Sequence, residues 1–196
     1  MQTYELKTPL SEKDVKKLRI NDIVYLSGWI YVARDKVHMR VLEYEKKKKK
    51  LPFDWKNGVI FHCGPLVEKK NNRWRIVGIG PTTSSRMNKL QPDIIEKYGI
   101  RAIIGKGGMN QNAINSMKKN ACIYLAMTGG CAASAAKSVK TIEDVRWLDL
   151  GTPEALWVLD VERLGPLIVA IDSHGGSIYQ KVDSAVKNNL KELIKS

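Results

Sequence analysis

The sequence predicts an α/β fold in which a mixed sheet is flanked by helices. Up to about residue 80, the chain contains several short segments rich in β-branched and aromatic residues, which are typical of strands. From about residue 81 onward, short apolar segments alternate with segments of helical spacing, as in sheets whose parallel strands are joined by helices. A chain of 196 residues that is 43% hydrophobic can bury a sizeable core, so we expect one domain over residues 1–196.

The first part of the chain, to about residue 80, is expected to be β-rich. Residues 46–50 are five consecutive lysines and Pro52 follows them, so we expect a solvated loop at about residues 45–57 that projects between extended segments. Residues 70–72 predict a turn between two further strands. The strands expected in this part are residues 23–30, 58–62 and 74–79.

The second part, from about residue 81 to 196, is expected to alternate between strands and helices. Leu90, Ile94 and Ile95 recur at helical spacing and predict a helix at about residues 85–98. Gly99 would end that helix as a C-terminal glycine does. The other helices expected here are residues 107–119, 132–137 and 177–194, and the strands are residues 102–104, 121–127 and 167–172.

Composition argues against several classes of protein. No apolar run approaches the ~20 residues needed to cross a bilayer, and residues 1–17 do not resemble a secretory signal, so we expect a cytoplasmic protein without membrane contact. Cys63, Cys122 and Cys131 are widely spaced and form no Cys-x-x-Cys pair, so we expect no disulfide framework and no metal ligands in this chain. The net charge of +13 indicates an acidic partner: nucleic acid, an anionic substrate or an acidic protein surface.

The loop at residues 80–86 is unusually rich in hydroxyl groups. Gly80 and Pro81 would turn the chain sharply, hydroxyl-bearing residues follow at 82–85, and Arg86 would lie in the first turn of the next helix. One hydroxyl suffices to cap a helix, whereas the free N–H groups of a helix start, together with Arg86, would also bind an anion. Taken alone, the loop is more typical of a helix cap, and an anion site is the competing interpretation.

Two further loops carry cations at the ends of expected strands. Lys106 lies among the glycines of residues 105–108, which do not form a Walker P-loop because Ile100 stands where that motif has a glycine. Arg34 follows the first strand, and Asp35 and His38 could orient it. Each loop alone is compatible with an ordinary turn. Together the loops predict a receptor for a small di-anion that lacks its own electrophile and therefore needs a partner chain.

Six motifs occur in the order typical of one family. They resemble the β subunit, or C-terminal-domain equivalent, of the class I iron–sulfur fumarate hydratase and L(+)-tartrate dehydratase family, over nearly the whole chain. The motifs are Ala-Arg-Asp-x-x-His at 33–38, His-Cys-Gly-Pro at 62–65, Gly-Pro-Thr-Thr-x-x-Arg-Met at 80–87, Gly-Lys-Gly-Gly-Met at 105–109, Gly-Thr-Pro-Glu-Ala-Leu-Trp at 151–157 and Gly-Pro-Leu-Ile-Val-Ala-Ile-Asp-Ser-His-Gly at 165–175.

The resemblance implies a swivelling β/β/α domain that binds no cofactor itself. It implies a partner α subunit that carries a [4Fe–4S] cluster, in an α2β2 heterotetramer, and Thr82 as the catalytic base. A neutral threonine is a weak base, so neighbouring cations would have to stabilise its alkoxide. The ligands implied for a small dicarboxylate substrate are Arg34, Arg86, Lys106 and Thr83, with Asp35 and His38 in support. We expect an isolated chain to be colourless and inactive.

The reaction expected is the reversible hydration of fumarate to L-malate. Between fumarate and tartrate, a substrate of central metabolism is the more common case. Many class I fumarases carry Ala-Lys-Gly-Asn in place of residues 105–108 and Ala-Gly in place of Ser84 and Ser85, and the first difference is closer to tartrate dehydratases. An L(+)-tartrate dehydratase β subunit is therefore the alternative. An RNA-binding module is the alternative of another class, because residues 105–108 imitate the Gly-x-x-Gly loop of K-homology domains. A third interpretation is a subunit that only stabilises its partner.

Overall fold

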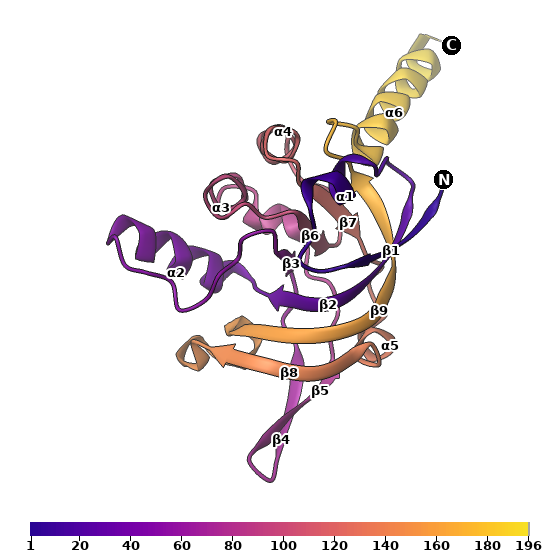
Figure 1. Ribbon diagram of the computed structural model, residues 1–196. Coiled ribbons are helices and arrows are strands. Elements are labelled where there is room, and N and C mark those ends of the chain that lie inside the picture. The colour runs from indigo at the N-terminus through magenta and orange to yellow at the C-terminus, as the bar shows by residue number, and fades with distance from the viewer. Residues whose placement is uncertain (196) are drawn as a thin grey trace.

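One mixed sheet forms the centre of the computed structural model, which describes residues 1–195 (Figure 1). The strand order is β1-β2-β3-β6-β7-β9-β8, and β2 pairs with β9 as well. β2, β3, β6 and β7 are parallel, while β9 runs antiparallel to both β2 and β7 and so closes these strands into a small barrel. The strands are β1 (Thr3–Lys7), β2 (Ile23–Val32), β3 (Val59–Phe61), β6 (Ala102–Gly105), β7 (Ile123–Ala126), β8 (Val139–Arg146) and β9 (Leu156–Ile171), with a separate hairpin of β4 (Leu66–Lys70) and β5 (Arg73–Gly78).

Helices connect these strands, and α2, α3 and α4 lie along one side of the sheet, while α6 extends away from it (Figure 1). The α-helices are α1 (Glu12–Lys16), α2 (Asp35–Lys46), α3 (Gln91–Tyr98), α4 (Gln111–Lys119), α5 (Ala132–Ala136) and α6 (Ile178–Lys195). The 3-10 helices are η1 (Ser84–Met87), η2 (Leu148–Leu150) and η3 (Thr152–Glu154). None of the helices described is long and apolar enough to cross a membrane.

The alternation of side chains along the strands divides the core into two clusters. In β3, Val59 and Phe61 belong to the first cluster, whereas Ile60, which points the opposite way, belongs to the second. The second cluster also includes Val41 of α2 and Ile94 of α3. The helices therefore cover one face of the sheet, and the strands bury their other face among themselves.

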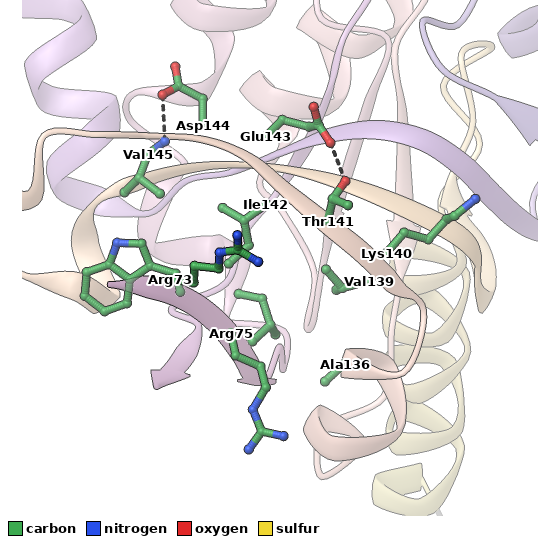
Figure 2. A pocket seen from close by; sticks show the side chains of 12 residues that line it. Arg73, Arg75, Ala136, Val139, Lys140, Thr141, Ile142, Glu143, Asp144 and Val145 are labelled. Carbon is green, nitrogen blue, oxygen red and sulfur yellow. Dashed lines mark hydrogen bonds between the residues drawn. The ribbon is translucent and has the colours of Figure 1, made fainter. Parts of the chain in front are cut away.

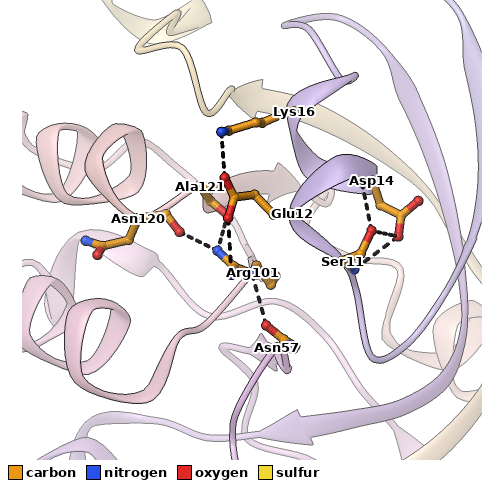
Figure 3. Close-up of polar contacts among 8 residues, drawn as sticks. All are labelled: Ser11, Glu12, Asp14, Lys16, Asn57, Arg101, Asn120 and Ala121. Atoms are coloured by element: carbon orange, nitrogen blue, oxygen red, sulfur yellow. Dashed lines mark hydrogen bonds and ion pairs between the residues drawn. The ribbon is translucent and has the colours of Figure 1, made fainter.

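Arg101 ties α1 to the segment that leads into β6 (Figure 3). Ser11 begins α1 with a capping box, in which its hydroxyl accepts from the Asp14 N–H and the Asp14 carboxylate accepts from the Ser11 N–H. Glu12 of this helix lies 3.8 Å from Arg101 Nη2, and Nη1 donates to the Asn120 carbonyl at 2.6 Å. One guanidinium thus joins three segments that are distant in sequence.

The structure confirms the predicted fold class, and each predicted strand corresponds to a strand of the sheet or hairpin, although β9 begins well before the predicted segment at 167–172. The turn at residues 70–72 is confirmed, since Asn71 and Asn72 have positive φ between β4 and β5. The helices expected at 107–119, 132–137 and 177–194 are present as α4, α5 and α6. Gly99 ends α3 in the left-handed conformation, with φ of 62°.

Several predictions were wrong. Neither α1 nor α2 was predicted, and Lys46 of the lysine run is the last residue of α2. The loop that follows does not simply project: Trp55 is 1% exposed and packs in the second cluster. The helix expected at 85–98 is divided into η1 and α3, because Pro92 starts a new helix near its N-terminus. β1, β4, β8 and the first half of β9 were not predicted.

Candidate active site

The parallel strands bring four loops to one edge of the sheet. Because β2, β3, β6 and β7 run in the same direction, their carboxyl ends lie together, which is where open α/β sheets bind ligands. Arg34 follows β2, His62 follows β3, Lys106 follows β6 and Gly129 follows β7. The loops that carried the site prediction therefore meet although up to 95 residues separate them in sequence.

The Thr82 loop is held between the ends of β3 and β6. The Thr82 N–H donates to the His62 carbonyl at 2.6 Å, and the Thr82 carbonyl accepts from the Lys106 N–H at 3.2 Å. The Ser84 N–H then donates to the Lys106 carbonyl at 3.0 Å. These bonds fix the backbone on both sides of Thr82, whose side chain is half-buried, and leave Thr83 exposed. The loop therefore presents a hydroxyl from a rigid position at the edge of the sheet.

The hydroxyl groups of this loop do not cap the helix that follows. Thr83 is the residue before η1, and its side chain makes no capping hydrogen bond. Ser84 is buried and directs its hydroxyl to His62 and Tyr124 instead. The interpretation of the loop as a plain helix cap is thus wrong, because the Thr83 side chain caps no helix and the Ser84 hydroxyl contacts His62 and Tyr124 instead.

Two carboxylates hold the two arginines of the site. Glu154 in η3 lies 3.1 Å from Arg34 Nη2, and Asp35 Oδ2 lies 2.8 Å from Arg86 Nη2 and 4.0 Å from Arg34 Nε. Gly64 makes room for the Arg34 guanidinium, since a Cβ there would lie 2.4 Å from Nη1. The carboxylates restrict the orientation of both forks without occupying all their donors, so planar N–H groups remain to bind a carboxylate.

Lys106 is an exposed cation directly after β6. It has no ion pair with any described residue, and its stem passes Gly129, where a Cβ would lie 3.8 Å from Lys106 Nζ. Thr83 and Lys106 form an isolated bridge between their backbones, which keeps the lysine next to the Thr82 loop. The edge therefore carries three cations and two carboxylates, an excess of positive charge suited to an anion.

A buried polar group lies beneath the Thr82 loop. His38 and His62 are fully buried with ring centroids 5.2 Å apart, and both place Nε2 within hydrogen-bond distance of the Gln91 side chain. Burial lowers the pKa of His38, and burial together with neighbouring His38 lowers the pKa of His62 well below its ordinary value. Both imidazoles are therefore neutral near pH 7. His38 Nδ1 lies 2.8 Å from the Arg34 carbonyl, so it orients the Arg34 segment through the backbone.

Glu154 and Gln91 were not assigned a role from the sequence. Glu154 lies within the motif at residues 151–157, and an acidic residue in a family motif was the available signal. His62 also belongs to a motif, but its loop alone is typical of a tight turn. Gln91 carried no signal, because a glutamine before Pro92 at a helix start is ordinary in sequence and acquires its partners only through the fold.

The cysteines of this chain do not fit an iron–sulfur cluster. Cys63 and Cys122 belong to the two different core clusters, so their thiols cannot share one metal group. Burial raises the pKa of Cys63 to about 12 and also raises the pKa of Cys122, whereas cluster ligands are thiolates. Within residues 1–195, no group of three or more His, Cys, Asp or Glu side chains could hold a metal ion.

A groove of about 730 Å³ lies elsewhere, between β5 and β8 (Figure 2). Arg73, Arg75 and Lys140 line it, together with Thr141 and Glu143, which are hydrogen-bonded to each other. None of the predicted site residues lines this groove. The candidate site at the carboxyl ends of the parallel strands is therefore separate from this groove.

The family model described as "Fumarase C-terminus" matches residues 1–182. A protein of Methanocaldococcus jannaschii named "Putative L(+)-tartrate dehydratase subunit beta" is 50% identical over 94% of this chain and 95% of its own length. The "L(+)-tartrate dehydratase subunit beta" of Escherichia coli K12 is 40% identical over 88% of this chain and 85% of its own. A Geobacillus stearothermophilus protein named "Putative fumarate hydratase class I" is 36% identical over 96% of this chain but only 35% of its own length.

The chain therefore belongs to the fumarase C-terminus family, among the β subunits of its hydro-lyases. The match covers almost all of the sequence, whereas the RNA-binding interpretation accounted only for residues 105–108.

Proposed function

We propose that this chain is the substrate-binding small subunit of an iron–sulfur hydro-lyase that acts on a four-carbon dicarboxylate. The observation that carries the proposal is the convergence of Thr82, Arg34, Arg86 and Lys106 at one edge of the barrel, with Asp35 joining the two arginines. A di-anion needs a cation for each of its two carboxylates, and the site offers two planar guanidinium groups and the ammonium group of one lysine.

Thr82 is assigned as the base and the cations as ligands of the two carboxylates. In the dehydration of L-malate, the Thr82 alkoxide takes the proton from the carbon next to a carboxylate. The electrons of that C–H bond form the carbon–carbon double bond, and the hydroxyl on the adjacent carbon leaves with the electron pair of its C–O bond. Hydration of fumarate reverses these steps. Lys106 and Arg86 stabilise the alkoxide, since nearby positive charge favours the ionised form.

The partner of this proposal is an α subunit that carries the [4Fe–4S] cluster. The printed name "subunit beta" of the relatives supports a partner chain, and the buried thiols of this chain are unsuited to holding a cluster themselves. An α2β2 heterotetramer in the cytoplasm is the assembly proposed. A small dicarboxylate is the substrate class, and neither nucleic acid nor a membrane is a partner.

Fumarate remains the first substrate proposed, and L(+)-tartrate is a second candidate. Fumarate is preferred because a role in central metabolism is the more common case, and because the 36% identical relative is named "Putative fumarate hydratase class I". The names of the relatives at 50% and 40% identity favour tartrate. L-malate, the hydrated form of fumarate, and L(+)-tartrate both present two carboxylates and a leaving hydroxyl, so the same cations and base serve either reaction.

The test is anaerobic co-expression of the chain with its α subunit, followed by assays of fumarate, L-malate and L(+)-tartrate side by side. Thr82→Ala should lower kcat by at least about 100-fold, as loss of a positioned base does, and Thr82→Ser should retain part of the activity. Ser85→Ala is the matched control, because Ser85 is exposed on the same loop. Absence of turnover on all three substrates would refute the hydro-lyase proposal, and full activity of Thr82→Ala would favour a purely structural subunit.

A further inference from the structure

The side chains beneath the Thr82 loop form one connected series of polar contacts. His38 Nε2 lies 3.1 Å and His62 Nε2 lies 2.9 Å from the same atom of the Gln91 amide. His62 Nδ1 lies 2.9 Å from Ser84 Oγ, which in turn lies 3.0 Å from Tyr124 Oη. All of these contacts are shielded from solvent, so each donor must face an acceptor.

Proton accounting determines which atom of Gln91 faces the two histidines. A backbone carbonyl only accepts, so His38 Nδ1, 2.8 Å from the Arg34 carbonyl, must carry a hydrogen. A neutral His38 then has a bare Nε2 that needs a donor. The amide oxygen of Gln91 faces both rings, and its amide nitrogen is buried without a hydrogen-bond partner among residues 1–195. Exchanging the two atoms resolves the conflict, because one NH₂ group can donate to both Nε2 atoms.

The exchange also satisfies His62. With Nε2 as an acceptor, its Nδ1–H donates to Ser84 Oγ at 2.9 Å. The atom then left without a partner is the Gln91 oxygen, and an unpaired buried carbonyl is less rare in proteins than an unpaired N–H. Keeping the oxygen toward both rings would require His38 to be a buried cation, which its surroundings oppose.

We propose that Gln91 is a positioning residue whose amide nitrogen donates to both His38 and His62 and thereby fixes the Arg34 segment relative to the Thr82 loop. His38 is bonded to the Arg34 carbonyl. His62 is bonded to the Thr82 N–H through its carbonyl and to Ser84 through its ring. One buried amide thus fixes the position of Arg34, a proposed carboxylate ligand, relative to Thr82, the proposed base. This role rests on the function proposed above for Thr82 and Arg34.

The orientation of the amide is tested in the full chain by ¹⁵N NMR of its histidine rings, of which there are three. His38 and His62 should both show a protonated Nδ1 and a bare Nε2 at neutral pH. Spectra of His38→Asn and His62→Asn assign the resonances. His174→Asn, at an exposed position, removes the third ring, whose Nε2 lies 2.9 Å from the Lys16 carbonyl, and leaves the signals of His38 and His62 alone. A protonated Nε2 on either of these two rings would overturn the proposal.

Kinetics of the assembled enzyme test the positioning role. Gln91→Leu should lower kcat by about 100-fold with a smaller change in KM, because displacing a catalytic group by about 1 Å has that effect. Gln91→Glu has nearly the same shape, but its carboxyl group has at most one hydrogen to donate against the two of the amide, so it cannot donate to both rings and should also lose activity. Wild-type kcat in Gln91→Glu or Gln91→Leu would overturn the proposal. Gln111→Leu, at an exposed glutamine, is the matched control and should leave kcat unchanged.

The outcomes separate this role from the function on which it rests. If the wild-type assembly turns over no dicarboxylate, the proposed function fails, and the ring tautomers alone decide how Gln91 is oriented. If the wild type is active and Gln91→Leu is equally active, the positioning role fails and the hydro-lyase proposal stands. Circular dichroism of each variant confirms that a lower kcat belongs to folded protein.

Discussion

The hydroxyl of Ser84 occupies space that only a glycine at position 105 leaves open. A Cβ on Gly105 would lie 1.9 Å from Ser84 Oγ and 3.0 Å from Tyr124 Oη. Ser84 and Gly105 therefore form one packing feature, in which the serine hydroxyl is accommodated because the neighbouring strand carries no side chain at that point.

This contact predicts that substitutions at the two positions are coupled. Gly105→Ala should destabilise the chain by about 1–3 kcal/mol, because the added methyl overpacks the site. In a Ser84→Ala background the same change should cost less, with an interaction energy of about 1 kcal/mol or more. Urea denaturation of the wild type, both single variants and the double variant measures this energy.

Gly129→Ala is the control for that cycle, since a Cβ there would meet only Lys106 at 3.8 Å. Its effect on the free energy of unfolding should be independent of Ser84. Additive costs for Ser84→Ala and Gly105→Ala would show that the methyl group and the hydroxyl do not compete for the same space.

At the scale of single elements, α3 owes its end to one backbone conformation. Gly99 has φ of 62°, and no atom lies within 4 Å of the position that a Cβ would take. Gly99→Ala should therefore lower the free energy of unfolding by about 1 kcal/mol through the backbone alone. Gly99→Asn should cost less, because asparagine tolerates the left-handed conformation better. Urea denaturation would contradict this account if the alanine variant were as stable as the wild type.

The predictability of each element follows from how deeply it is buried. β6 and β7 are continuous apolar segments buried on both faces, so their sequences alone identify them. β8 is an edge strand with lysine, glutamate and arginine among its side chains, and it lacks that signal. α2 begins after Arg34 without a side-chain cap and leads into the lysine run, so its sequence resembles a solvated loop. Only contact with the sheet makes it a helix.

At the scale of the whole molecule, barrel closure assembles what sequence order separates. The cations were predictable because each stands in a loop after a strand. The pairing of Glu154 with Arg34 could not be predicted, since the two residues lie 120 positions apart and meet only because β9 pairs with β2. Gln91 likewise meets His38 and His62 only when α3 packs against the sheet. Local sequence thus indicates the candidate ligands, while the groups that orient them depend on the fold.

The far part of α6 is the region least integrated with the rest of the molecule. Ile178 and Tyr179 pack against the second core cluster, whereas the side chains of residues 181–194 are exposed, and the helix extends away from the sheet (Figure 1). The family match also ends at residue 182. We therefore expect that the domain does not depend on the distal turns for its stability.

A chain ending at Lys181 should unfold within about 2–4 °C of the full-length Tm, a shift that corresponds to roughly 1 kcal/mol in a domain of this size. A chain ending at Ser177 should lose more, because it also lacks Ile178 and Tyr179 and uncovers the second cluster. Thermal denaturation followed by circular dichroism compares the two. An equal, large decrease in Tm for both chains would contradict this expectation, because it would mean that the distal turns of α6 stabilise the domain although their side chains are exposed.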